Sequence, residues 1–393
     1  MLDQRDIQNN IDQFVIDMFN HAIYLDASDI HIEPEETYAR LRLRIDGKLN
    51  EIMRINRENY DRLTSKIKLL SNMDISEHRR PQDKNLKMLA FPNIDFRVSS
   101  IGTVNGEKLV IRILSSMNFS EMDKLMGFEE KSKLALTEAM KNRSGMIIFS
   151  GPTGSGKSTS LYSLLDQLNN DYDNIITVED PVEYNIEGIN QININENIGF
   201  TFASALRSIL RQDPDIIMVG EIRDYETAQI AIRAAITGHL VLTTLHTNNA
   251  LASIIRLKDL GIENYLLSSA INTVASQRLV RKLCDCKEKD TMTDYEYEIA
   301  KRHIDIDRAQ PIYRPKGCRL CNDGYKGREA AAEVFILTDE FRDMIRNGKI
   351  DLVEFSSYAE DNDFTTMAEN ALKKVVDGTT SFEEVMAVMY DQL

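Results

Sequence analysis

The stretch Gly151-Pro152-Thr153-Gly154-Ser155-Gly156-Lys157-Ser158 decides the fold of this chain, because it is a complete G-x-x-x-x-G-K-S motif. It follows an apolar run at 146–149 and precedes a helical pattern at 159–168, and this order of strand, loop and helix is the context that the motif requires. Glycines let backbone N–H groups curl around an anion, and the dipole of the following helix adds to the attraction. The stretch therefore predicts a site for a nucleoside triphosphate.

Two side chains of this motif have specific expected roles. Lys157 is expected to reach the β- and γ-phosphates of ATP, and Ser158 is expected to hold Mg²⁺. Thr159 follows them directly, so residues 151–159 form the predicted nucleotide cradle. ATP and Mg²⁺ are the cofactors that this motif predicts.

Three further apolar runs follow the motif, at 175–178, 216–219 and 240–245. Short apolar strands that alternate with helices indicate a parallel α/β sheet. The runs lead into Glu179, Glu221 and His246, respectively. Because ligands of such sheets bind outside the carboxyl ends of the strands, we expect these side chains to share one site with the phosphate loop.

The acids at these strand ends fit ATP hydrolysis, which needs one group to activate water and another to support the metal. Glu221 is assigned as the water-activating residue, and Glu179, with Asp180 and Glu183, is the candidate for the metal and its waters. His246 can sense or polarise the γ-phosphate. A single acid in such a position is often a helix cap or a surface residue, but two on the edge that carries the phosphate loop favour a catalytic role.

Arginines are expected at the site, because charge spreads over the phosphoryl group in the transition state and a second domain or subunit often supplies the cation. Within the same part of the chain, Arg207 and Arg223 flank the strand that ends in Glu221, and Arg211 is an equal candidate.

A hairpin of the N-terminal part offers two more arginines. If Asn105-Gly106 is its two-residue turn, Arg112 faces Ser99 and lies diagonal to Arg97 on the same side of the sheet. Both guanidinium groups then project together from this part of the chain. The alternative is a pair of ordinary solvated sheet arginines.

The chain before the motif is predicted to be a small α+β domain. Its expected elements are a helix at 9–24, a hairpin of 38–45 and 51–55, a helix at 58–72 and a hairpin of 94–101 and 107–114. The predicted domains are a small α+β domain (1–115), a linker (116–124), an ATPase core (125–283), a tetracysteine excursion (284–321) and an acidic helical C-terminal region (322–393).

Charge and hydropathy exclude several classes of protein. The 393 residues carry a formal charge of −15. Binding of nucleic acid needs a positively charged surface, so this charge disfavours it. No apolar stretch approaches the roughly 18 residues of a membrane span, and the N-terminus lacks the basic start and apolar run of a signal peptide. We therefore expect a cytoplasmic protein that does not bind nucleic acid.

Four cysteines, Cys284, Cys286, Cys318 and Cys321, are too few for a disulfide scaffold and predict a structural Zn²⁺ site. Cys318 and Cys321 have the C-x-x-C spacing of tetrahedral thiolate sites. The C-x-C spacing of Cys284 and Cys286 fits less well, so this pair is expected to bind weakly or to supply a single ligand. The alternative is a decayed site with four free thiols.

Together these motifs resemble the secretion-superfamily motor ATPases, specifically the branch of type IV pilus assembly and type II secretion. The matching segments are residues 28–31, 44–47, 73–75, 80–83, 151–158, 178–183, 210–215, 220–228 and 238–247. The resemblance implies a RecA-like P-loop NTPase core behind a PAS-like N-terminal domain. It also implies an aspartate box at 176–184, a Walker B segment at 215–221 and a histidine box at 238–247, and it supports Arg97 and Arg112 as arginines that reach the nucleotide when the two domains close.

The resemblance further implies a cytoplasmic homo-hexamer beneath an inner-membrane platform protein, in which ATP hydrolysis drives domain motions that move pilin subunits. This sequence departs from the family in two respects. Longer members carry an additional N-terminal docking domain, so the chain is expected to be truncated or to be a naturally short member like the competence-pilus ATPases. The first cysteine pair is C-x-C where members usually have C-x-x-C.

Alternatives to an assembly or secretion motor stay open at this point. A retraction or competence-pilus ATPase of the same family shares these motifs. A nucleic-acid translocase on a similar core is disfavoured by the charge, and a non-catalytic nucleotide-dependent scaffold is disfavoured by the intact Lys157, Ser158 and Glu221.

Overall fold

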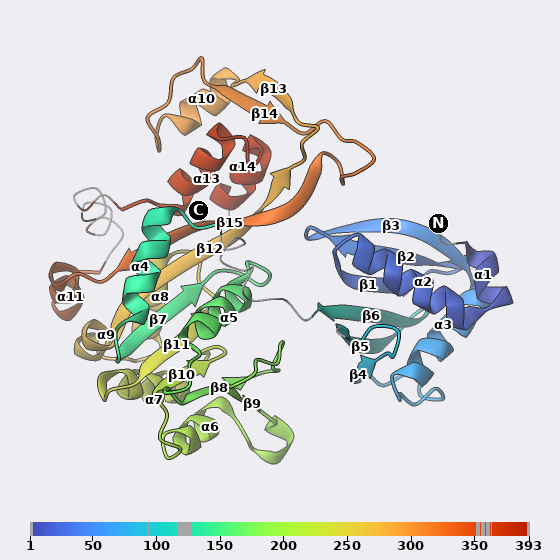
Figure 1. The fold of residues 1–393 in the computed structure, drawn as a ribbon, viewed down its shortest axis with the longest axis horizontal. Helices are drawn as coiled ribbons and strands as arrows, with labels where there is room; N and C mark the ends of the chain where they lie inside the picture. Colours follow the sequence, from blue (N-terminus) through green and yellow to red (C-terminus); the bar gives the residue numbers. More distant parts are fainter. Residues whose placement is uncertain are drawn as a thin grey trace. The chain divides into compact units, whose positions relative to one another are not determined.

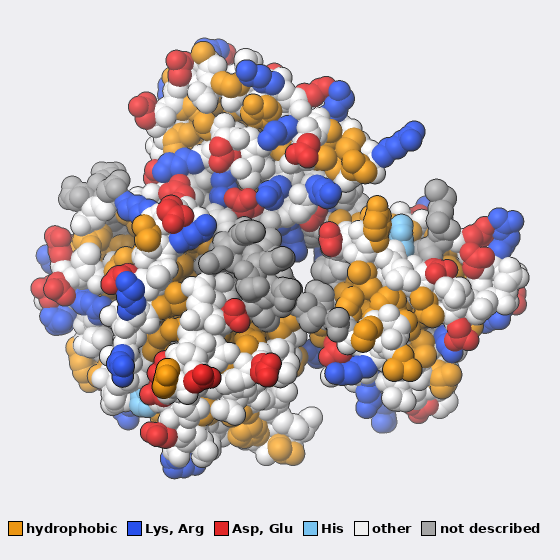
Figure 2. Space-filling model, in the orientation of Figure 1, with side chains coloured by type: hydrophobic (Ala, Val, Ile, Leu, Met, Phe, Trp, Pro, Cys, Tyr) orange, Lys and Arg blue, Asp and Glu red, His pale blue; other side chains and the backbone are white. Residues whose placement is uncertain are grey.

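The structure is a computed structural model, and it describes residues 3–92, 94–115, 127–350, 354, 358, 362 and 364–390 (Figure 1). The chain divides into two compact units, Met1–Met117 and Asn118–Leu393. The expected linker at 116–124 lies outside the described residues. Figure 2 shows acidic and basic side chains interspersed over the visible face of both units.

The first unit contains helices and an antiparallel sheet. Its helices are α1 (Gln4–Asn9), α2 (Ile11–Tyr24) and α3 (Arg57–Leu70). Its strands are β1 (Ala27–Pro34), β2 (Tyr38–Ile45), β3 (Lys48–Asn56), β4 (Gln82–Lys87), β5 (Ile94–Thr103) and β6 (Gly106–Ser115). They pair in the order β3-β2-β1-β6-β5-β4. Apolar side chains of α2 and α3, such as Phe19 and Leu63, pack against one face of this sheet.

The expected α+β character of this unit is present, with three differences. The helix expected at 9–24 is α2, which begins at Ile11 because the Asn10 side chain caps it by accepting a hydrogen bond from the Gln13 N–H, and an additional helix, α1, precedes it. Strands β1 and β4 were not expected. The predicted turn at Asn105-Gly106 is wrong: Thr103 pairs with Gly106, so Val104 and Asn105 form the turn.

The second unit is built around a parallel sheet. Its strands are β7 (Gly145–Ser150), β8 (Ile175–Glu179), β9 (Asn190–Asn193), β10 (Ile216–Val219), β11 (Leu240–Leu245), β12 (Ile271–Leu283), β13 (Glu288–Thr291), β14 (Pro311–Arg314) and β15 (Tyr325–Ile336). Its helices are α4 (Glu130–Met140), α5 (Lys157–Leu168), η2 (Glu196–Ile198), α6 (Phe202–Ile209), α7 (Tyr225–Ile236), α8 (Ala250–Asp259), α9 (Asn264–Ala270), α10 (Asp294–Ala300), α11 (Asp339–Arg346), α13 (Met367–Val376) and α14 (Phe382–Tyr390).

Seven strands form the main sheet of this unit, in the order β15-β12-β7-β11-β10-β8-β9. All neighbours are parallel except β12 and β15. Alternate residues of β7 enter two different cores: Ile148 packs with α6 to α9, and Phe149 packs with α4 and α5. The sheet is thus covered by helices on both faces, as the apolar strands predicted (Figure 1).

The C-terminal part differs from the prediction. Residues 322–393 were expected to be helical, yet β15 lies within them and pairs with β12 from Thr273 to Leu283. Its buried alanines, at 330–332, have high helix propensity, but burial in the sheet outweighs that local preference. Helices α13 and α14 follow, and they pack over the segment between the two cysteine pairs.

No helix within the described residues is long and apolar enough to cross a membrane.

Candidate functional site

The phosphate loop lies between β7 and α5, at the carboxyl end of β7. Gly151, Gly154 and Gly156 have φ angles of +144°, +78° and +88°, which residues other than glycine rarely adopt. Gly156 also occupies the N-cap position of α5, so the loop leads directly into the positive end of a helix dipole. The loop thus has the backbone shape that an anion site at a helix N-terminus requires.

Lys157 is held inside this loop. It is 7 % exposed, and its Nζ donates to Gly151 O at 2.7 Å and to Pro152 O at 2.9 Å. Burial lowers the pKa of Lys157 to about 8, and the carboxylates of Glu221 and Glu183 oppose that shift. The ammonium therefore lies within electrostatic reach of two acids at the carboxyl end of the sheet.

Glu221 follows β10 and lies between two of the predicted side chains. Arg223 Nη2 lies 2.6 Å from Glu221 Oε1, and His246 Nε2 lies 3.4 Å from Glu221 Oε2. Glu221 Oε2 is buried and accepts no hydrogen bond from the described residues. Burial lowers the pKa of His246, and Lys157 contributes to that shift. One carboxylate oxygen is thus anchored by Arg223, and the other lies beside His246 without a hydrogen-bond donor among the described residues.

Glu179 belongs to a separate buried cluster. It is 4 % exposed, and its carboxylate accepts hydrogen bonds from Tyr162 and Thr177, and from Gln191 at 3.3 Å. Burial raises the pKa of Glu179. These donors fix the first residue of the acidic loop, whereas Asp180 is exposed and acts electrostatically on Arg223.

The other two candidate arginines of the second unit, Arg207 and Arg211, lie in and just after α6. Arg207 of α6 forms an ion pair with Glu226 of α7. Arg211 donates to Arg207 O at 2.7 Å. The structure thus brings Lys157, Glu221, Arg223 and His246 together and pairs Arg207 with a surface acid.

The hairpin arginines of the first unit are nearer to each other than predicted. The pairing of β5 with β6 places Arg97 directly opposite Arg112, and not diagonal to it, because the turn is at Val104 and Asn105. Directly opposite residues share a face of the sheet, with Cβ atoms about 5 Å apart. Asp29 of β1 contacts one member of this pair, with Oδ1 3.0 Å from Arg112 Nε.

Three residues near the phosphate loop had no role in the sequence-based prediction. Tyr162 of α5 donates to Glu179 and accepts from the Glu183 N–H at 3.2 Å. Gln277 of β12 contacts the phosphate loop, and its neighbour Arg278 lowers the pKa of Lys157. Strand β12 mixes apolar residues with polar and basic ones and carries no motif, so the sequence offered little signal for it.

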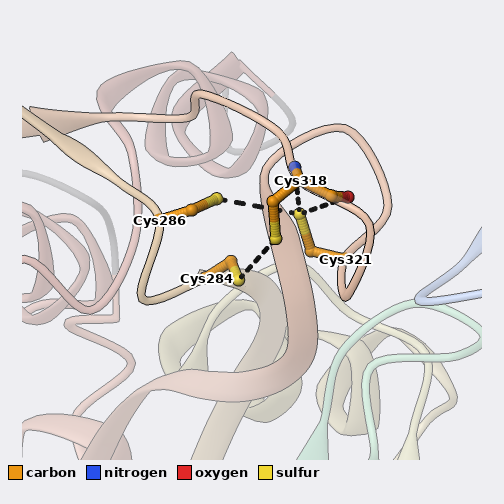
Figure 3. Close-up of side chains that lie close together, drawn as sticks. All are labelled: Cys284, Cys286, Cys318 and Cys321. Atoms are coloured by element: carbon orange, nitrogen blue, oxygen red, sulfur yellow. Dashed lines mark hydrogen bonds between the residues drawn. The ribbon is translucent and has the colours of Figure 1, made fainter.

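The four cysteines form a second candidate site, at the end of β12 and in the loop before β15 (Figure 3). Their Sγ atoms all lie within 4.8 Å of one another. The Cys284–Cys318 and Cys286–Cys321 Sγ distances are 3.9 and 3.8 Å, too long for disulfides of about 2.05 Å. Sulfurs bound tetrahedrally to zinc at about 2.3 Å are about 3.8 Å apart, so the donor set fits this metal.

The expectation that the C-x-C pair supplies a single ligand is not supported by this geometry, since both Cys284 and Cys286 lie in the cluster. A turn accommodates the short spacing, with Lys287 N–H donating to Cys284 O at 2.9 Å. On the other side, Cys318 N–H donates to Cys321 Sγ at 3.1 Å, which fixes the position of that sulfur.

The second unit is a P-loop nucleotide-binding domain. Its parallel sheet carries the phosphate loop after β7, and Glu221 follows β10, two strands away in the sheet. The chain belongs to the family described as Type II/IV secretion system protein, whose sequence profile matches residues 4–387. This confirms the resemblance to the secretion-superfamily ATPases.

Curated relatives cover nearly the whole chain. The type IV pilus assembly ATPase PilB of Acinetobacter baylyi is 44 % identical over 391 residues, which are 98 % of this chain and 67 % of the relative. PilB of Myxococcus xanthus is 44 % identical over 93 % of this chain and 65 % of its own length. Type II secretion system protein E of Aeromonas hydrophila is 43 % identical over 94 % of this chain and 74 % of its own length. The chain thus spans about two thirds of the length of its pilus-assembly relatives.

Solved structures support the predicted fold. The pilus retraction motor PilT with bound ADP has a TM-score of 0.65 and 28 % sequence identity, with 95 % of this chain and 96 % of PilT covered. The ATPase DotB of Legionella pneumophila has a TM-score of 0.70 at 23 % identity, with 96 % of this chain and 95 % of DotB covered. The mixed α/β architecture with a RecA-like core is confirmed.

Proposed function

We propose that this chain is the ATP-hydrolysing motor subunit of a type IV pilus assembly or type II-like secretion machine. The observation that carries the proposal is the position of Glu221, which has a carboxylate oxygen without a hydrogen-bond partner among the described residues and lies within electrostatic reach of the phosphate-loop lysine. Family membership supports it, because relatives in this family are named as ATPases of pilus assembly.

The described side chains supply the parts of a phosphoryl-transfer site. The backbone of 151–157 surrounds the phosphates, and Lys157 exchanges its two carbonyl acceptors for phosphate oxygens. Glu221 orients the attacking water through its carboxylate, while Arg223 holds Oε1 and His246 lies beside Oε2. Ser158 would hold Mg²⁺ with the acidic loop near Glu179, and the ion would neutralise phosphate charge.

Steady-state ATP hydrolysis by the purified chain tests this proposal. We expect phosphate release that depends on Mg²⁺ and saturates with ATP. Stoichiometric binding of ATP without cleavage, in the assembled protein, would instead indicate a nucleotide-dependent scaffold.

Assembly into a homo-hexamer beneath an inner-membrane platform protein is part of the proposal, as is a cytoplasmic location. It is supported by relatives of pilus and type II secretion machines. A separate unit that carries paired arginines also favours such an assembly, because a mobile domain or a neighbouring subunit can then complete the nucleotide site.

Arg97→Ala and Arg112→Ala are each expected to reduce kcat about 10-fold or more while changing nucleotide affinity much less. Two like charges directly opposite each other destabilise a sheet, so their pairing favours a functional role over a structural one. Arg54→Ala, at an exposed arginine of β3, is the matched control. Wild-type kcat at saturating ATP in both variants would show that the hairpin arginines are ordinary surface residues.

We also infer that the four cysteines hold one structural Zn²⁺ ion. The ion would join the end of β12 to the loop before β15. The same strand end is also held by a hydrogen bond from the Leu283 N–H to Thr379 O, in the segment between the C-terminal helices α13 and α14. The site would thus stabilise the segment between the cysteine pairs rather than take part in hydrolysis.

Elemental analysis of protein purified without chelator is expected to give about one zinc per chain, with the four thiols protected from titration under native conditions. Cys318→Ser should lower the zinc content and the thermal unfolding temperature together. Well below one zinc in the wild-type chain, with four thiols reacting freely, would eliminate the metal and leave this segment held by packing alone.

A further inference from the structure

Gln277 is a buried polar residue that the proposed hydrolysis does not use. It lies in β12, the strand next to β7, and is 1 % exposed. Its neighbour Ser276 pairs with Ser150, the last residue of β7. The side chain of Gln277 is therefore held at the point where the chain leaves the sheet to form the phosphate loop.

Both ends of the Gln277 amide bind the phosphate-loop segment. Nε2 donates to the main-chain oxygen of Ser155 at 2.8 Å, and Oε1 accepts from the Ser160 hydroxyl at 2.9 Å. Ser155 belongs to the loop and Ser160 to the first turn of α5, so one side chain joins the loop to the helix that follows it.

The bond to Ser155 O has a consequence for the neighbouring N–H group. Ser155 O and the Gly156 N–H belong to one peptide group, and this peptide is not among the cis bonds of the described chain. In a trans peptide the C=O and N–H bonds point in opposite directions. Anchoring the oxygen toward β12 therefore turns the Gly156 N–H away from β12, toward the side where a phosphate binds.

The glycines of the loop show how closely it sits on this residue. A Cβ atom added to Gly151 would lie 2.4 Å from Gln277 O, and one added to Gly156 would lie 3.0 Å from Gln277 Nε2. Real Cβ contacts are rarely this short, so the loop approaches Gln277 to a distance that only glycine allows.

We propose that Gln277 is a positioning residue that holds the phosphate loop, before nucleotide arrives, in the shape that binds phosphate. It acts through the Ser155–Gly156 peptide and does not touch the reacting atoms. The proposal deepens the nucleotide-binding part of the proposed function. It is independent of hydrolysis, because the N–H orientation matters for ADP as much as for ATP.

Gln277→Met tests this role, because methionine has similar length and volume but cannot make either hydrogen bond. We expect ADP affinity, measured with a fluorescent ADP analogue, to fall about 10-fold, and KM for ATP to rise by a similar factor. The change in kcat should be smaller, since the variant disturbs ground-state binding. If Gln277 had only a structural role, the variant would have a lower unfolding temperature, but KM would not rise more than kcat falls.

Thr273→Val is the matched control within the same strand. Thr273 is fully buried, and its hydroxyl has no hydrogen-bond partner in the part of the chain that the structure describes. This variant also replaces a polar group by an apolar one of similar shape, and it should keep wild-type ADP affinity.

Ser160→Ala leaves Gln277 in place and removes only the second hydrogen bond, so it tests the link if Gln277→Met fails to fold. We expect an intermediate loss of ADP affinity, about 3-fold. Wild-type ADP affinity in a folded Gln277→Met, or in Ser160→Ala where Gln277→Met does not fold, would overturn the proposal, as would an equal loss in Thr273→Val. Weakened ADP binding in a chain that does not hydrolyse ATP would support this role for Gln277 and contradict the hydrolytic function.

Discussion

Lys157→Ala is expected to abolish binding of ATP and ADP at concentrations where the wild-type chain is saturated. The ammonium group lies inside the phosphate loop and has no other described acceptors than the carbonyl oxygens of Gly151 and Pro152. Its removal leaves the β- and γ-phosphates without their main positive partner. Fluorescence titration with a nucleotide analogue measures the effect.

Lys141→Ala serves as the control, because Lys141 is an exposed lysine that pairs with Glu138 on the surface. It should bind nucleotide as the wild-type chain does. Retention of near wild-type affinity in a folded Lys157→Ala would contradict the assignment of this loop as the phosphate site.

Glu221→Gln is expected to leave ATP binding intact and to lower turnover about 10²-fold or more, so that ATP is trapped in the site. Glutamine keeps the shape of the side chain but cannot take a proton from water. Because the amide also weakens the contact with Arg223, affinity and turnover should be measured in the same preparation.

The exposed Glu138 provides a control, since Glu138→Gln removes a charge far from the strand ends in the sequence and should not change turnover. Normal hydrolysis by Glu221→Gln would move the water-activating role to Glu179. The two variants described here therefore separate binding from cleavage: Lys157→Ala loses both, and Glu221→Gln loses only cleavage.

Local sequence patterns predicted the parts of the site that depend on a strand followed directly by a functional residue. Each of β7, β8, β10 and β11 is a short apolar run, and its functional residue or loop follows at or soon after its carboxyl end. Because parallel strands share one carboxyl edge, knowing the strands was enough to bring Lys157, Glu221 and His246 together.

Contacts between distant parts of the chain could not be predicted in this way. Tyr162 and Gln277 reach their partners across 17 and 122 residues, through hydrogen bonds to Glu179 and to Ser155 O. Neither residue type carries a motif of its own. The hydrogen bond from Tyr162 to Glu179 was likewise not predicted, since the sequence position of Glu179 indicated only an acid at a strand end.

The register of β5 and β6 and the arrangement of the cysteine loops could not be predicted from the sequence either. Gly106 was expected in a turn, but its φ of +131° belongs to the first residue of β6, and this shift places Arg97 opposite Arg112. The C-x-C spacing looked unfavourable because spacing statistics ignore the facing loop, which brings Cys318 and Cys321 to the other two thiols.

The most direct test of ATP cleavage at this site is a single-turnover experiment, in which the full chain is mixed in excess with labelled ATP and Mg²⁺ and the bound nucleotide is identified after quenching. The wild-type chain should convert bound ATP into ADP and phosphate, while Glu221→Gln should retain ATP. Bound ATP that remains uncleaved in the assembled wild-type chain would contradict the assignment of the strand-end acids as a hydrolytic site.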